Sequence, residues 1–143
     1  MDLYTGVRIM GAPNRYFQGP GLITGLDDYI YSFEMGEKAL VILDKGAIGV
    51  VKDPLLESLK RKKIFWKLVE FRGECCRKEI DRIKGSTITE RFDVIIGAGG
   101  GKAIDTAKVI ASECNLALII VPTITSTDAP CSFLLYFILR TGF

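Results

Sequence analysis

A short stretch in the second half of the chain restricts the fold more than any other. Asp93–Asp105 reads Asp-Val-Ile-Ile-Gly-Ala-Gly-Gly-Gly-Lys-Ala-Ile-Asp. Its β-branched run predicts a buried strand, and the consecutive glycines predict a sharp turn because glycine tolerates a positive φ. From Lys102 the apolar residues are spaced for one buried face of a helix. A strand, a glycine turn and a helix in this order indicate an α/β fold whose turn exposes backbone N–H groups.

Such a turn can hold a phosphate group. Free N–H groups and the positive end of a helix dipole favour an anion, and the pyrophosphate of a nucleotide is the ligand that we expect. Two familiar phosphate-binding patterns do not fit this sequence. The dinucleotide fingerprint needs glycine at Lys102, and the P-loop needs glycine at Ile96 and a hydroxyl at Ala103. A tight turn without a ligand is the alternative, since glycines often follow strands in α/β domains.

The rest of the chain alternates between strand and helix patterns. Apolar runs predict strands at 15–18, 39–43, 64–71 and 116–121. Helical spacing predicts helices at 22–33, 54–63, 76–84 and from 102 onward. Pro54 suits the first turn of its helix, and Gly36 is expected to end the helix that precedes it. Strands that alternate with helices of about ten residues predict one domain with a Rossmann-like, doubly wound parallel sheet.

The composition excludes several classes of function. The 143 residues contain no histidine, so neither a Ser/His/Asp or Cys/His triad nor a histidine-ligated zinc can form within this chain. The net charge of +2 argues against a nucleic-acid partner, and the basic run Lys60–Lys63 is interpreted as a solvated helix end. The apolar run Phe133–Leu139 is too short to span a membrane. Cysteines without C-x-x-C spacing, and no signal peptide at the first residues, predict free thiols in the cytoplasm.

Three segments follow the carboxyl ends of predicted strands, where parallel sheets bind their ligands. They are Asp44, Gly97–Lys102 and Thr123–Pro130. An acid at the first of these positions can bind both hydroxyl groups of a ribose, which favours NAD over its phosphorylated form. Capping of a helix, or a solvated acid in a loop, explains Asp44 equally well.

Two motifs together carry a family resemblance. Pro122–Pro130 reads Pro-Thr-Ile-Thr-Ser-Thr-Asp-Ala-Pro, and Gly99–Asp105 reads Gly-Gly-Gly-Lys-x-x-Asp. With these motifs, residues 13–132 resemble the bacterial glycerol dehydrogenases of the iron-containing, or group III, alcohol dehydrogenase superfamily, although members of the superfamily usually carry serine where Lys102 stands. Further matches are Tyr16–Gly21, Ala39–Asp44 and Gly73–Cys75.

The resemblance implies that residues 1–143 form the NAD-binding N-terminal domain of a glycerol dehydrogenase. The residues implied to bind the cofactor are Asp44, Gly99, Gly100, Gly101, Lys102, Asp105, Thr123, Ser126 and Ser132. The glycines and Lys102 would hold the pyrophosphate, Asp105 would brace the turn, and Asp44 would face the adenosine ribose. The hydroxyl side chains would line the cleft toward the nicotinamide.

The resemblance gives the substrate role to Asp128. Its carboxylate would accept hydrogen bonds from neighbouring hydroxyl groups of glycerol or a similar small polyol. Alternatively, Ser126, Thr127 and Asp128 form a cluster that caps a helix N-terminus, and both roles can coexist. A relative that acts on a sugar phosphate would need extra cationic residues near Asp128, and the sequence shows none.

Family members continue into a helical domain in which an aspartate and two histidines bind zinc. There the metal polarises the substrate oxygen so that hydride can pass to the nicotinamide. Because this sequence lacks that domain, we expect no catalytic and no metal-binding residue in it, and no activity from this chain alone. A non-catalytic nucleotide-binding or oligomerising fragment is the alternative function. Family members also assemble, so we expect a homo-oligomer.

Residues 133–143 depart from the family pattern. The segment Phe137–Gly142 reads Phe-Ile-Leu-Arg-Thr-Gly. Codons for the family sequence Val-Ile-Tyr-Thr-Glu-Asp-Gly can spell this segment when they are read one base out of register. A frameshifted gene that ends early is our hypothesis for this tail. A genuine apolar strand at the sheet edge is the alternative.

Overall fold

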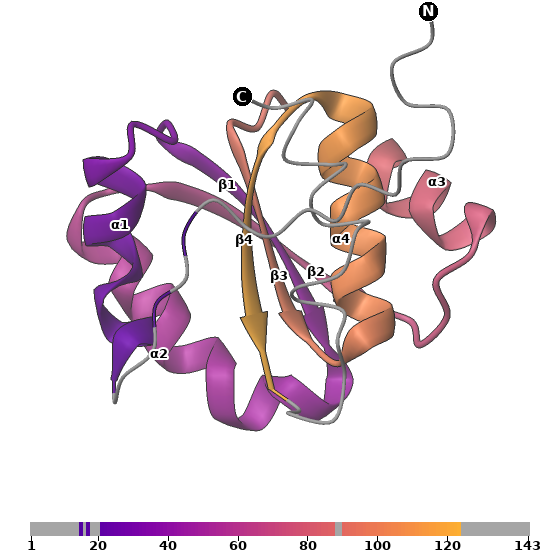
Figure 1. Cartoon of the computed structure of the whole chain (residues 1–143), viewed down its shortest axis with the longest axis horizontal. Coiled ribbons are helices and arrows are strands. Elements are labelled where there is room, and N and C mark those ends of the chain that lie inside the picture. Colours follow the sequence, from indigo (N-terminus) through magenta and orange to yellow (C-terminus); the bar gives the residue numbers. More distant parts are fainter. Residues whose placement is uncertain (1–14, 16, 18–20, 88–89, 124–143) are drawn as a thin grey trace, which may run out of the picture.

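The computed structural model describes residues 15, 17, 21–87 and 90–123. Within this part of the chain, four parallel strands form one sheet in the order β2-β1-β3-β4 (Figure 1). The strands are β1 (Lys38–Asp44), β2 (Phe65–Phe71), β3 (Val94–Gly99) and β4 (Ala117–Pro122). The predicted parallel sheet is confirmed, and three predicted strands agree with β1, β2 and β4 to within a residue at each end. The edge strand expected at 15–18 and the tail at 133–143 fall largely or wholly outside the described residues.

Helices connect the strands and cover both faces of the sheet (Figure 1). They are the 3-10 helices η1 (Leu22–Gly25) and η2 (Lys45–Ala47) and the α-helices α1 (Leu26–Ser32), α2 (Ile48–Arg61), α3 (Arg77–Gly85) and α4 (Gly101–Cys114). The predictions for α3 and α4 are confirmed to within a residue. The predictions for α1 and α2 need correction.

Helix α2 begins before the predicted residue 54. It starts at Ile48, directly after η2, so Pro54 lies inside the helix and not in its first turn. A proline there removes one hydrogen bond of the helix. The buried side chains of Val51, Leu55 and Leu59 pack on both sides of the proline and offset this loss. Tertiary packing has therefore outweighed the local signal.

The helix predicted at 22–33 is divided and ends early. Its first part is η1, α1 ends at Ser32, and Gly36 lies beyond it with a φ of 95°. Gly36 instead allows a close approach, because a Cβ there would lie 2.3 Å from the Cβ of Asp93. Oδ2 of Asp93 accepts hydrogen bonds from the backbone N–H groups of Glu37 (2.9 Å) and Lys38 (3.0 Å). These contacts join the starts of β1 and β3.

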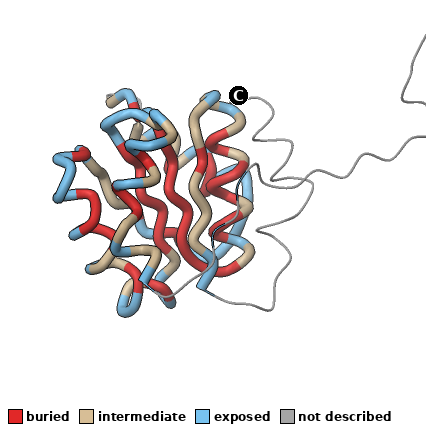
Figure 2. Tube along the Cα trace, turned by 60° about the vertical axis from the view of Figure 1, so that its left-hand side comes forward, coloured by how far each residue is buried: buried red, intermediate tan, exposed pale blue. Residues whose placement is uncertain are grey.

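Alternating residues of the central strands build one core on each face of the sheet. Leu40, Ile42 and Ile95 face α3 and α4, whereas Val41 and Ile96 face α1 and α2. Figure 2 shows the resulting band of buried residues through the middle of the sheet. Because burying one such aliphatic side chain contributes about 1.5–3 kcal/mol, this band is the main source of stability. Trp66 is half-buried and packs against the α1/α2 core.

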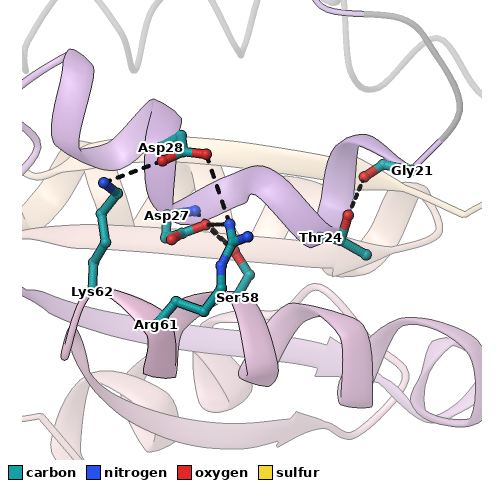
Figure 3. A network of polar contacts seen from close by, with 7 residues as sticks. All are labelled: Gly21, Thr24, Asp27, Asp28, Ser58, Arg61 and Lys62. Carbon is teal, nitrogen blue, oxygen red and sulfur yellow. Dashed lines mark hydrogen bonds and ion pairs between the residues drawn. The ribbon is translucent and has the colours of Figure 1, made fainter.

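A polar network fastens α1 to α2 (Figure 3). The side chain of Asp27 is 1% exposed, and its Oδ1 accepts hydrogen bonds from the Ser58 hydroxyl (2.7 Å) and the Arg61 guanidinium. Burial acts to raise the pKa of Asp27, but the bonds from Arg61 and Ser58 outweigh it and hold that pKa below its usual value. Asp28 is exposed and pairs with Lys62 at 3.2 Å. The basic run 60–63 thus lies at a helix end as predicted, and it also contacts the acids of α1.

Candidate functional site

The strand order creates a switch point between β1 and β3. From this pair of strands, β2 lies on one side and β4 on the other. The connections therefore leave β1 and β3 in opposite directions, and the carboxyl ends of such a pair of strands are where these sheets bind ligands. Asp44 ends β1 and Gly99 ends β3. Two of the three segments predicted to bind ligands thus meet at this switch point.

Gly99 allows the two strand ends to approach each other. Its φ of 150° is one that side-chain-bearing residues rarely adopt. A Cβ at Gly99 would lie 2.4 Å from the Cβ of Asp44 and 3.1 Å from that of Ala103. At Gly97, a Cβ would lie 2.5 Å from the Cβ of Ala107. These two glycines therefore bring Asp44 and α4 close to the end of β3.

The N-terminus of α4 lies directly after Gly99 and has no side-chain cap. Its N-cap residue is Gly100, and its first turn contains no acidic residue. The first backbone bond into the helix runs from the N–H of Ile104 to the carbonyl of Gly100 (3.1 Å). The N–H groups of the first turn have no partner inside the helix, and they lie at the positive end of the dipole. This terminus is suited to an anion.

Asp44 lies against this terminus and also caps η2. Its Oδ1 accepts a bond of 3.3 Å from the N–H of Gly46, and its Oδ2 lies 3.5 Å from the N of Gly100. The capping interpretation of Asp44 is therefore confirmed. Both contacts are long, so the carboxylate keeps acceptor capacity for further donors.

Of the other predicted site residues, the structure describes two and leaves three outside the described ranges. The N–H of Thr123 donates to the carbonyl of Gly99 (3.0 Å), so the segment after β4 begins at the same turn. Asp105 pairs with Lys108 within α4, at 3.3 Å. Ser126, Asp128 and Ser132 lie outside the described residues.

Lys102 has a partner that the sequence did not indicate. Its Nζ lies 2.7 Å from Oε1 of Glu74, in the loop after β2. Glu74 belongs to a tripeptide that matches the family, but that resemblance assigns it no function. Because Glu74 and Lys102 are 28 positions apart, no local pattern could have joined them. The two residues meet because the loop that leads from β2 into α3 lies next to the turn that leads from β3 into α4.

The described residues can bind an anion and a group rich in hydroxyls. Among them, no cluster of three or more histidine, cysteine, aspartate or glutamate side chains could hold a metal ion. In the same ranges, no helix has both the length and the apolar character needed to cross a membrane. The candidate site consists of the amides at the start of α4, the ammonium group of Lys102 and the carboxylates of Asp44 and Glu74.

Comparisons with known proteins show what the chain is similar to. The model of the family described as iron-containing alcohol dehydrogenase matches residues 13–140. The chain is 39% identical over 127 residues to the glycerol dehydrogenase of Escherichia coli. This match covers 89% of this chain and 34% of that protein. It is 40% identical over 126 residues to the glycerol dehydrogenase of Thermotoga maritima, covering 85% of this chain and 32% of that one.

A solved structure shows the same fold. The crystal structure of a probable glycerol dehydrogenase from Sinorhizobium meliloti superposes with a TM-score of 0.75 at 37% identity, and the match covers 87% of this chain and 33% of that one. The chain thus spans about a third of the length of the relatives that it matches.

Proposed function

The chain belongs to the iron-containing alcohol dehydrogenase family, and from this membership we propose that it is the NAD-binding part of a glycerol dehydrogenase. One observation supports the nucleotide most directly. The uncapped N-terminus of α4, with Lys102 in its first turn, faces the switch point of the sheet beside Asp44. That combination suits a dinucleotide, which carries a diphosphate next to a ribose.

The described residues would divide the binding of NAD as follows. The N–H groups of the first turn of α4 and the ammonium of Lys102 would bind the pyrophosphate oxygens. Asp44 has spare acceptor capacity and would bind the ribose hydroxyls, because a carboxylate accepts bonds from both. The same negative charge would repel a 2′-phosphate, so we propose NAD over its phosphorylated form. Asp105, through its pair with Lys108, would brace the first turns of α4.

The activity of the whole protein is a further part of this proposal. Relatives named glycerol dehydrogenase support the oxidation of glycerol to dihydroxyacetone, with hydride passing to the nicotinamide. Thr123, Ser126 and Ser132 would line the nicotinamide side, and Asp128 would bind the polyol. A bound metal would polarise the alcohol oxygen, and the sequence resemblance suggested zinc, although the family is described as iron-containing. No group of ligands for it lies among the described residues, so no step is assigned to them.

Both functions weighed from the sequence, the nucleotide domain of a glycerol dehydrogenase and a non-catalytic nucleotide-binding or oligomerising fragment, predict that this chain by itself binds NAD without turnover. We propose that it binds NAD and that turnover requires the remainder of a longer enzyme, since it spans only about a third of its relatives. A merely structural remnant would leave the switch point without a ligand. Cytoplasmic location and homo-oligomeric assembly stay proposals from the sequence.

Calorimetric titration tests the binding role. We expect the chain to bind NAD and ADP-ribose, and to bind adenosine much more weakly because adenosine lacks the diphosphate. With glycerol present, NAD should not be reduced by the purified chain. Absence of heat with NAD at millimolar concentration would overturn the nucleotide-binding role. Reduction of NAD by a preparation free of full-length enzyme would show that the rest of the protein is not required.

A further inference from the structure

The strongest unexplained contact at the switch point is the ion pair between Glu74 and Lys102. The two charged atoms are 2.7 Å apart, and the side chains come from different connections of the sheet. Lys102 lies in the first turn of α4, where the proposed diphosphate would bind. The carboxylate of Glu74 thus holds the ammonium group that the ligand needs.

Stability does not account for this pair. The side chain of Glu74 is 72% exposed and that of Lys102 is 63% exposed. Ion pairs in such exposed positions add little net stability, because water solvates both groups and two long side chains must be ordered. Two ion pairs at the other end of α4 contrast with it: Glu113 is 29% exposed and binds both Arg77 and Lys84, which joins α3 to α4. The Glu74–Lys102 pair is the one that a ligand can separate.

The backbone around Glu74 is nevertheless well defined. Gly73 adopts a φ of 99°, and the N–H of Arg72 donates to Oε1 of Glu79 (2.9 Å). Glu79 is itself held by Arg82 at 2.6 Å. The N–H of Cys76 donates to the carbonyl of Glu74 (3.1 Å). The loop therefore presents the Glu74 side chain at a fixed point from which it can reach Lys102 or turn toward water.

We propose that Glu74 is an internal counter-ion that competes with the diphosphate for Lys102 and thereby lowers the affinity of the site. The inference rests on the proposed nucleotide binding and adds a residue that tunes it. Without ligand, the carboxylate neutralises Lys102. A diphosphate brings more charge and more acceptor oxygens, so it displaces the carboxylate and forms charge-assisted bonds with the ammonium and the helix amides.

The variant Glu74→Gln removes the charge while nearly keeping the shape of the side chain. We expect it to bind NAD and inorganic pyrophosphate about two- to fivefold more tightly than the wild-type chain, the range that corresponds to an exposed ion pair. The difference should shrink at high salt, which screens the competing pair. The matched control is Glu57→Gln, since Glu57 forms a similarly exposed pair with Lys60 at 2.9 Å. We expect that control to leave both affinities unchanged.

Repeating the substitution in a Lys102→Ala background separates competition from a general effect of charge. If Glu74 acts through Lys102, Glu74→Gln should no longer tighten binding there. Equal tightening in both backgrounds would overturn the proposal, as would unchanged or weaker binding by Glu74→Gln when the wild-type chain binds NAD. A lower unfolding free energy together with weaker binding would identify Glu74 as a structural residue instead. If neither chain binds NAD or pyrophosphate, the proposed function itself fails and this inference fails with it.

Discussion

Helices α1 and α4 both begin after a glycine, yet the protein itself closes the start of α1, which continues directly from η1, and leaves the start of α4 open. The N-cap residue of each is a glycine, Gly25 or Gly100, and neither helix has a side-chain cap. The first turn of α1 contains Asp27 and Asp28, whereas the first turn of α4 contains no acid. The first turn of α1 therefore carries its own acids where α1 packs on α2, whereas the start of α4 meets only the long contact from Asp44. The difference separates a structural helix start from one left open to a ligand.

The largest effect is expected at the closed helix. In Asp27→Ala, the buried hydroxyl of Ser58 and the guanidinium of Arg61 lose their shared acceptor. We expect the unfolding free energy to fall by about 2–3 kcal/mol, chiefly the cost of leaving the buried Ser58 hydroxyl without its acceptor, since the exposed Arg61 can bind water. Urea denaturation followed by circular dichroism measures it. The matched control is Asp28→Ala, which should cost roughly 0.5 kcal/mol because Asp28 is exposed. Equal losses in the two variants would contradict the contrast.

A smaller effect is expected at the open helix, and on a different quantity. Lys102→Ala should weaken NAD binding about tenfold, because one charge-assisted bond to the diphosphate is lost. Its unfolding free energy should stay within roughly 0.5 kcal/mol of wild type, since the pair it breaks is exposed. Calorimetry measures the affinity, and Lys60→Ala is the control at an equally exposed lysine. A loss of stability without a loss of affinity would show that Lys102 stabilises the fold and does not bind NAD.

The smallest effect concerns pH. The pKa of Asp27 is lowered on folding, so the unfolded chain binds more protons between the folded and unfolded values. The stability from this carboxylate is complete above its usual pKa of 3.8 and is lost as the pH falls through the lower, folded value. We expect wild type to lose more stability than Asp27→Asn from roughly pH 6 to pH 3. Glu79 and Glu113, whose pKa values are also lowered, are present in both chains and cancel. If the urea midpoints of wild type and Asp27→Asn fall equally as the pH is lowered, the assignment of this effect to Asp27 is wrong.

The two central strands were predictable from the sequence because they are continuous apolar runs. All residues of Ala39–Leu43 and Val94–Gly99 are buried, and a strand buried on both faces has this pattern. The start of α2 was not predictable in the same way. Pro54 is a strong local signal for a helix start, whereas the packing of Val51 is decided by tertiary contacts.

The candidate site was predictable only as far as its parts are local. The glycine turn and the helix after it lie in one segment, so their sequence was enough to expect an anion site. The contact of Asp44 with Gly100 spans 56 positions, and it followed from the rule for strand ends rather than from any motif. Glu74 and the network around Asp27 depend on side chains from separate elements, 28 and 31 positions apart. Their partners could not be inferred before the strand order was known.

The position of β1 between β2 and β3 also affects how this molecule can fold. Pairing β1 with β2 closes a short loop, but pairing β1 with β3 requires the chain to bring together residues 55 positions apart, as in the bond from Lys38 to Asp93. The entropy of closing that long loop must be overcome before any contact across it contributes. Asp44 ends β1 and Gly100 follows β3, so these two residues come together only when the long loop closes. A partly folded chain that contains only β1 and β2 therefore lacks the proposed nucleotide site, so a nucleotide would stabilise only chains that have passed this step.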